Sequence, residues 1–366
     1  MAYVVLLALG ALDAAGYGVI APVVPEISDR TGAGAGVIGL LVTCFGLGQL
    51  VGYPVAGWGV RRWHASVVLA ASLALTAAGD LAFAFGDGLA AWFPARVLMG
   101  IGAGGLWMGV VFGLLERYPG QEYRRLTGLL GAYAVGGVAG PALGAVGGIR
   151  GPFLLHLGLV LAAGIALLQI GAPRERPRFE SDAGVLRSPG FVLASAGVLL
   201  IALSLGTLEG PLPLHLGERL SQEEIAGLFV VASLVVGASS VAAGWAQPRP
   251  ALGVGVVLLP AGLGLAGAAD QVWIWIVAVL VVALGFGVGE AGALGVLLQS
   301  VGVRRIVLAM VVWSQAWAIG YLVGPAAAGG VAEALGFEAI GIVPLAAAAA
   351  VAVCFAWTPR ARRVPG

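Results

Sequence analysis

Four ionisable residues, Asp13, Arg96, Glu209 and Glu290, lie inside long apolar runs of the sequence. A charge at the middle of a bilayer costs about 2.5–3.5 kcal/mol on insertion scales, so such residues are retained for a function. A carboxylate can bind and release a proton or attract a cation. An arginine can balance a carboxylate or bind an anion. A permanent ion pair that only joins two helices is the structural alternative for Asp13 and Arg96.

The elements that must position these side chains are membrane helices. The chain has 366 residues, of which 60% are hydrophobic and 10% charged, whereas a soluble domain carries about 25% charged residues. Each apolar run can cross a hydrocarbon layer of about 30 Å at a rise of 1.5 Å per residue. The sequence predicts an all-α membrane protein with twelve transmembrane helices, over 2–24, 36–59, 65–86, 89–115, 126–148, 151–171, 190–214, 223–246, 250–268, 271–298, 305–332 and 337–357.

The distribution of arginine predicts the topology. All nineteen basic residues are arginine. Arg30, Arg150 and Arg219 fall on one side of the predicted spans, Arg96 lies within a span, and the remaining fifteen fall on the other side. By the positive-inside rule, both termini and the central loop are expected in the cytoplasm. We therefore expect a multi-pass protein of a bacterial inner (plasma) membrane, with its first run retained rather than cleaved.

An internal repeat divides the chain. Residues 132–144 read AYAVGGVAGPALG and residues 316–328 read AWAIGYLVGPAAA, at an offset of 184. The charged segment 172–189 separates six predicted spans from six others. We expect two six-helix bundles, 1–171 and 190–366, joined by a cytoplasmic linker. The predicted kink and gating positions are Gly136, Gly140, Pro141, Gly320, Gly324 and Pro325.

Three motifs resemble the major facilitator superfamily, and within it the twelve-helix drug:proton antiporters. They are LDAAGYGVIAPVVPEI (12–27), RVLMGIGAG (96–104) and GGVAGPALG (136–144). The resemblance implies that helices 1, 4, 7 and 10 line a central cavity. It also implies that Asp13 is the protonatable group, with Arg96 as its electrostatic partner. Glu209 and Glu290 are the counterparts in the second half, able to carry a proton or attract a cationic substrate. The family's loop after helix 2 is shortened here to GWGVRRWH (57–64), which keeps the gate residues Arg61 and Arg62 but has no aspartate.

Aromatic and amide side chains on the cavity helices are candidates for substrate binding. Aromatic walls suit apolar or cationic guests through stacking and cation–π contact, and amides orient a ligand. Packing or anchoring at the membrane interface is the alternative for each aromatic residue. Asp80 competes with Asp13 for Arg96, and His156 is assigned no role. The candidates are Tyr17, Gln49, Trp107, Tyr133, Gln299, Gln315 and Trp317.

Three functions remain open at this stage. The first is proton-driven export of small amphipathic or cationic compounds by alternating access. The second is a carrier for a sugar, amino acid or organic acid, in which Arg96 would bind an anionic substrate. The third is a membrane sensor or scaffold of the same fold that does not transport. An enzyme is not expected, because the sequence contains no phosphate-binding loop, HExxH, GxSxG or CxxC motif. We expect no cofactor, metal or nucleic-acid partner, and a monomer that binds protons and a small molecule.

Overall fold

The first half of the chain is a bundle of helices. The computed structural model describes residues 1–119, 121–171, 183–301 and 305–358. The predicted linker lies mostly outside these residues, as do Arg174, Arg176, Arg178, Arg304, Arg360, Arg362 and Arg363. The elements of the first half are α1 (Ala2–Gly18), η1 (Ala21–Val23), α2 (Val24–Thr31), α3 (Ala35–Arg62), α4 (Ala65–Phe85), α5 (Leu89–Arg117), α6 (Glu122–Gly144) and α7 (Arg150–Ile170).

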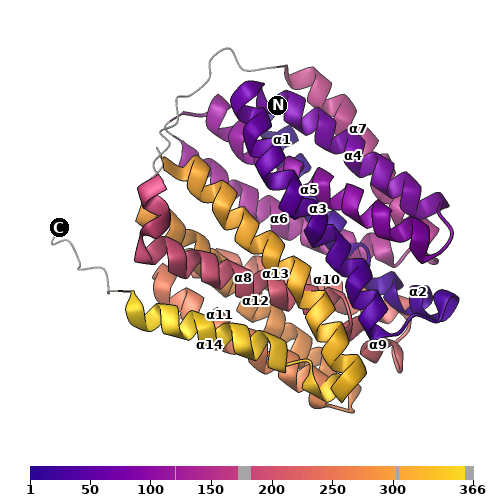
Figure 1. Ribbon diagram of the computed structural model, residues 1–366. Coiled ribbons are helices and arrows are strands. Elements are labelled where there is room, and N and C mark those ends of the chain that lie inside the picture. The colour runs from indigo at the N-terminus through magenta and orange to yellow at the C-terminus, as the bar shows by residue number, and fades with distance from the viewer. Residues whose placement is uncertain (120, 172–182, 302–304, 359–366) are drawn as a thin grey trace.

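The second half repeats this arrangement, and Figure 1 shows the two groups of helices side by side. Eleven helices in the described residues are long and apolar enough to cross a membrane. The apolar part of α6, Gly128–Gly144, stands where a twelfth was predicted, so the predicted fold class is confirmed. The elements of the second half are η2 (Ala183–Arg187), α8 (Pro189–Glu209), α9 (Leu212–Gly217), α10 (Gln222–Ala243), α11 (Pro248–Ala268), α12 (Val272–Val301), α13 (Ile306–Leu335), η4 (Phe337–Ala339) and α14 (Ile342–Trp357).

The first helix of each half is broken at the same place. Helix α1 ends at Gly18, and the chain continues through η1 and α2, which have Pro22 and Pro25 in their first turns. Helix α8 ends at Glu209, and α9 begins next to Pro211. Proline has no N–H to continue a helix but fits its first turn, which explains both breaks. The prediction treated each of these segments as one continuous helix.

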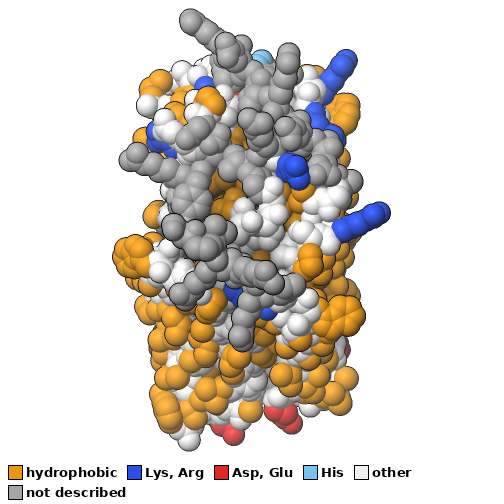
Figure 2. All heavy atoms as spheres, turned by 90° about the vertical axis from the view of Figure 1, so that its left-hand side faces the viewer, with side chains coloured by type: hydrophobic (Ala, Val, Ile, Leu, Met, Phe, Trp, Pro, Cys, Tyr) orange, Lys and Arg blue, Asp and Glu red, His pale blue; other side chains and the backbone are white. Residues whose placement is uncertain are grey.

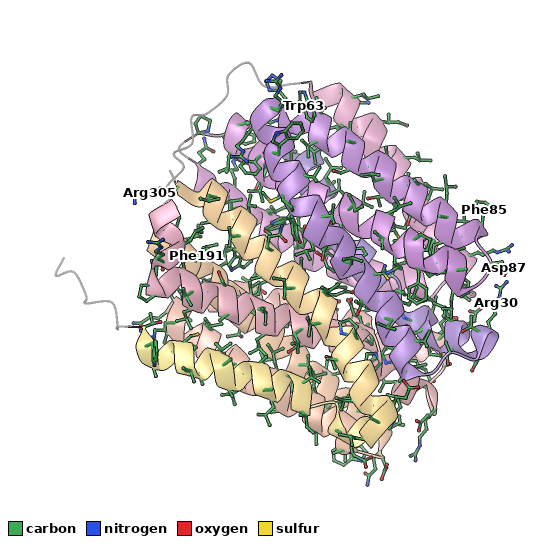
Figure 3. All side chains as sticks on the ribbon, in the orientation of Figure 1. Arg30, Trp63, Phe85, Asp87, Phe191 and Arg305 are labelled. Atoms are coloured by element: carbon green, nitrogen blue, oxygen red, sulfur yellow. The ribbon has the colours of Figure 1, made fainter. Side chains whose placement is uncertain are left out.

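The two ends of the bundle differ in charge. We call the end at which α1 begins and α14 ends the arginine-rich end, and the other the opposite end. Seven arginines with described side chains lie at the arginine-rich end. In Figure 2, arginine side chains gather toward one end of the visible face, and acidic side chains lie at the other. At the opposite end Arg30 pairs with Asp87 at 2.6 Å, as Figure 3 shows. The seven are Arg61, Arg62, Arg117, Arg125, Arg187, Arg249 and Arg305.

Glycines let equivalent helices approach closely within each half. A Cβ added at Gly140 of α6 would lie 2.5 Å from the carbonyl oxygen of Ala15 on α1. In the second half, Gly324 of α13 packs in the same way on the carbonyl oxygen of Leu203 on α8. Pro141 follows Gly140 and contacts Gly18, just as Pro325 follows Gly324 and contacts Gly206. Small residues permit such close packing of membrane helices. The two GxxxGP motifs therefore perform the same packing task.

The halves contact each other along α3 and α13 and along α6 and α10. The Thr43 hydroxyl on α3 donates to the carbonyl oxygen of Leu322 on α13 at 2.9 Å. At the opposite end, the Gln222 amide donates to the carbonyl oxygen of Gly144 at 2.8 Å. Gly217 of α9 also packs against Pro25 of α2. The two bundles are therefore in direct contact at the opposite end.

Candidate functional site

A cavity lies between the two halves. It contains about 1240 Å³ of space between atoms, part of it continuous with solvent. Helices α1, α3, α5 and α6 line it from the first half, and α8, α10, α12 and α13 line it from the second. Both halves of the chain therefore contribute to the cavity wall.

Aromatic side chains form much of the cavity wall. Trp107 and Tyr133 from the first half meet edge to face, with ring centroids 5.1 Å apart. Tyr17 and Trp317 meet across the two halves at 6.0 Å, and Phe286 lies 6.1 Å from Trp317. Edge-to-face contacts fix the orientation of each ring. The wall thus presents ring surfaces that can stack on a flat guest or contact a cation.

Two indole N–H groups in this wall lack a hydrogen-bond partner among the described residues. Trp313 and Trp317 line the cavity from α13, and neither Nε1 makes a hydrogen bond to the described residues. Trp107 differs, because its Nε1 donates to the Ser314 hydroxyl at 3.0 Å. Both Nε1 atoms are themselves shielded by neighbouring atoms, so a guest in the cavity would contact the rings and not these N–H groups.

Glu209 and Glu290 line the cavity from the second half. Glu209, at the end of α8, accepts a hydrogen bond of 2.5 Å from the Tyr321 hydroxyl. Glu290 on α12 is partly exposed, and its carboxylate receives no hydrogen bond from the described residues. Both residues were predicted as proton or cation sites, and the structure brings both to one cavity.

Asp13 lies behind the aromatic wall and accepts a hydrogen bond from the Tyr133 hydroxyl. It is 3% exposed, and its other carboxylate oxygen has no partner among the described residues. Tyr133 itself lines the cavity. The carboxylate is thus one side chain removed from the cavity, and the tyrosine connects the two.

The predicted pairing of Arg96 with Asp13 is wrong in this structure. Arg96 is completely buried, and its guanidinium lies over the ring of Phe45, 4.4 Å from the centroid. Its electrostatic neighbours include Tyr321 and Glu209 of the second half. No nitrogen of Arg96 forms a well-aligned hydrogen bond within the described residues. Arg96 therefore faces the Glu209–Tyr321 pair across the contact between the halves.

Asp80 has a partner that the sequence did not suggest. Its carboxylate lies 2.9 Å from Nδ1 of His156, and both side chains are almost completely buried. The prediction placed His156 near a solvated helix end and let Asp80 compete for Arg96. The observed pair joins α4 to α7 instead.

Three predicted amide ligands lie outside the cavity lining. Gln49 is fully buried, where it donates to the Tyr17 hydroxyl and, at 3.0 Å, to Tyr53. Gln315 donates to the carbonyl oxygen of Leu50 at 3.2 Å. Gln299 is exposed near the arginine-rich end of α12. The NH2 groups of Gln49 and Gln315 are thus bonded to protein, whereas the Oε1 atom of each is buried without a partner among the described residues.

The remaining predicted residues divide between the cavity and the arginine-rich end. Tyr17, Trp107, Tyr133 and Trp317 all line the cavity. The described residues contain no cluster of histidine, cysteine or acidic side chains that could hold a metal ion. Arg61 and Arg62 are exposed at the end of α3, and Arg61 donates to the Gly57 carbonyl of its own helix at 3.2 Å.

Several cavity residues were missed by the sequence analysis. Phe286 precedes Glu290 by four positions, and Trp313 precedes Trp317 by four. Residues four apart lie on one face of a helix, so this spacing was the available signal.

The sequence of this chain is similar to those of known membrane proteins. Residues 6–250 match the family model of the Major Facilitator Superfamily. Multidrug resistance protein 1 of Bacillus subtilis (strain 168) is 24% identical over 236 residues, which are 61% of this chain and 60% of that protein. Quinolone resistance protein NorA of Staphylococcus aureus is 26% identical over 130 residues, 35% of this chain and 34% of NorA. The chain thus matches less than two thirds of the length of either relative.

The fold is shared with solved transporters. A bacterial homolog of the human lysosomal transporter Spinster, in an inward-facing and occupied conformation, superposes with a TM-score of 0.74. The match covers 98% of this chain and 96% of that chain at 17% identity. The duplicated bundle, the cavity between its halves and the match over residues 6–250 agree: the chain belongs to the Major Facilitator Superfamily.

Proposed function

We propose that this transporter exports small amphipathic cations in exchange for protons. The observation that carries the proposal is the lining of the central cavity, where Glu209 and Glu290 lie among aromatic rings. A carboxylate in apolar surroundings attracts a positive charge, and the rings bind an apolar or cationic body. The names of the two relatives above, a multidrug and a quinolone resistance protein, support a drug-like organic substrate.

The alternative of an anionic metabolite has less support. It required Arg96 to bind the substrate, but Arg96 is buried outside the cavity lining and lies over Phe45. No arginine lines the cavity in the described part of the chain. An anion would therefore meet two carboxylates and no cationic side chain.

Proton exchange would use the same carboxylates. Substrate and proton compete for a shared negative charge, so binding of one favours release of the other. Asp13 can exchange its proton with the cavity through Tyr133, whose hydroxyl donates to it. The contacts of Pro25 with Gly217 and of Gln222 with Gly144 would break as the halves rock to expose the other side. The arginine-rich end would face the cytoplasm, in a bacterial inner membrane.

The test uses purified protein in liposomes. An imposed pH gradient should move a fluorescent amphipathic cation, whereas an anionic dye of similar size should not move. Asp13→Asn and Glu290→Gln should each abolish coupling to the gradient. Glu338→Gln is the matched control, because Glu338 lies at the opposite end and outside the cavity. Coupled flux that survives both Asp13→Asn and Glu290→Gln, or equal movement of the anionic dye, would show that the proposal is wrong.

A further inference from the structure

The buried pair of Asp80 and His156 has no role in the transport cycle proposed above. Asp80 on α4 is 0% exposed and His156 on α7 is 1% exposed. Nδ1 of His156 lies 2.9 Å from one carboxylate oxygen and 3.1 Å from the other. Neither residue lines the central cavity. Burying two ionisable groups so deep inside a membrane bundle costs free energy, so such a pair is a candidate for a function.

The second ring nitrogen faces another acceptor. Nε2 of His156 lies 3.4 Å from the carbonyl oxygen of Leu12 on α1. Leu12 directly precedes Asp13. The neutral imidazole donates with one nitrogen only, whereas the imidazolium donates with both. A neutral ring that donates to Asp80 would turn a lone pair toward the Leu12 carbonyl.

The charges around the buried pair also favour a protonated His156. If His156 were neutral and Asp80 ionised, the pair would hold an uncompensated negative charge in the bundle, which is expensive. If the proton lay on Asp80 and the ring were neutral, the pair would hold no charge and would supply none to Asp13. Three ionisable groups from other helices lie near the pair. Asp13 on α1 interacts electrostatically with His156, and Arg96 on α5 interacts electrostatically with Asp80. Tyr133 on α6 is hydrogen-bonded to Asp13. Arg96 is engaged toward Glu209 and Tyr321 of the other half. A protonated His156 would then be the cation that acts on Asp13 from within its own half.

We propose that His156, held by Asp80, is a positioning residue for Asp13. The doubly protonated ring donates through Nδ1 to Asp80 and through Nε2 to Leu12. It thereby ties the Asp13 turn of α1 to α4 and α7 and supplies a fixed positive charge beside Asp13. This takes over the role that the sequence assigned to Arg96. Only the link to proton exchange rests on the proposed function; the charge state of His156 does not.

The charge state can be measured directly. The chain has three histidines, so His64→Gln/His215→Gln leaves His156 as the only one. Neither of these substitutions touches the buried pair. In 15N-histidine NMR of the whole protein in lipid, His156 should carry protons on both ring nitrogens at about pH 7, where an unperturbed histidine is mostly neutral. A neutral ring, with either Nδ1 or Nε2 unprotonated, would overturn the inference.

The positioning role needs a readout that a purely structural role would not change. In liposomes, His156→Gln and Asp80→Asn should each shift the pH profile of exchange by about one unit toward alkaline pH, the effect expected when a charge near a carboxylate is lost. His215→Gln is the control, because His215 also pairs with a carboxylate, Glu218, but at the opposite end. Lower yield with an unchanged pH profile would contradict the positioning role.

The two failures can be told apart. If the wild-type protein moves no cation under any gradient, the proposed function is wrong, yet the NMR result still decides the charge state of His156. If the wild type exchanges and the single-histidine protein shows a neutral ring, the proposed function stands and this inference is wrong.

Discussion

Gly140 provides a direct test of how closely α1 and α6 must approach. A Cβ at this position would lie 2.5 Å from the carbonyl oxygen of Ala15, whereas real Cβ atoms stay beyond about 3.0 Å and normally beyond 3.4 Å. Gly140→Ala therefore requires the helices to separate by about 0.5–0.9 Å (3.0 − 2.5 and 3.4 − 2.5). The blocking atom belongs to the backbone, so no side chain can rotate away. Overpacking of this kind costs about 1–3 kcal/mol.

Two other glycines on α6 are matched controls. A Cβ at Gly131 would meet nothing within 4 Å, and one at Gly137 would lie at an ordinary 3.5 Å from the Ser233 hydroxyl. Alanine is favoured over glycine in a helix by about 1 kcal/mol in water, and this gain is common to all three substitutions. The difference between Gly131→Ala and Gly140→Ala should thus be the packing cost alone, about 1–3 kcal/mol.

The assay is thermal unfolding in detergent, followed by the loss of the monodisperse peak in size exclusion. We expect Gly131→Ala to match or exceed the wild type, Gly137→Ala to lie close to it, and Gly140→Ala to melt lowest. In the second half, Gly324→Ala should be destabilised relative to Gly330→Ala, which has open space around it. If Gly140→Ala melts together with Gly131→Ala, the close approach of α1 and α6 is not required and the packing argument fails.

Two further predictions concern movement and proton exchange. Pro25→Cys/Gly217→Cys, in a background without the native cysteines, should form a disulfide and stop transport until a reductant is added. The two Cβ positions are 3.1 Å apart, so a shift of only about 0.4 Å brings them to the shortest separation of a disulfide, about 3.5 Å. Continued transport by the cross-linked protein would show that this contact need not open. Tyr133→Phe removes the hydroxyl that donates to Asp13. Loss of a hydrogen bond to a charged group costs about 1.5–3 kcal/mol, so pH-driven exchange should slow roughly tenfold or more. An unchanged rate in liposomes would contradict a role for this bond.

The sequence predicts where each helix lies much better than which way its side chains point. The fourth predicted span, 89–115, became Leu89–Arg117, and the last, 337–357, is matched by η4 and α14 together. The interruption of α1 at Gly18 was missed, although Pro22 and Pro25 were visible. Hydropathy reports the depth of a residue in the membrane, and proline reports only that a helix can break nearby.

The partners of the buried charges could not be predicted, because hydropathy does not show which way a helix is rotated about its axis. Asp13, Asp80 and Arg96 were all identified as charges inside the membrane, but their pairing depends on how each helix is rotated about its axis. His156 lies only six residues from the start of α7, so its position along the chain suggested contact with water. In the bundle it faces α1 and α4, which shield it completely. Rotation of this kind is set by packing against neighbours, which one sequence does not reveal.

Both carboxylates of the cavity belong to the second half of the chain, where Glu209 lies on α8 and Glu290 on α12. Among the described residues, the first half contributes aromatic rings to the lining but no acidic side chain. An amphipathic cation would therefore bind with its ammonium group toward the second half and its apolar body toward Trp107 and Tyr133. A series of dyes of equal size that differ only in the place of the charge should separate by affinity.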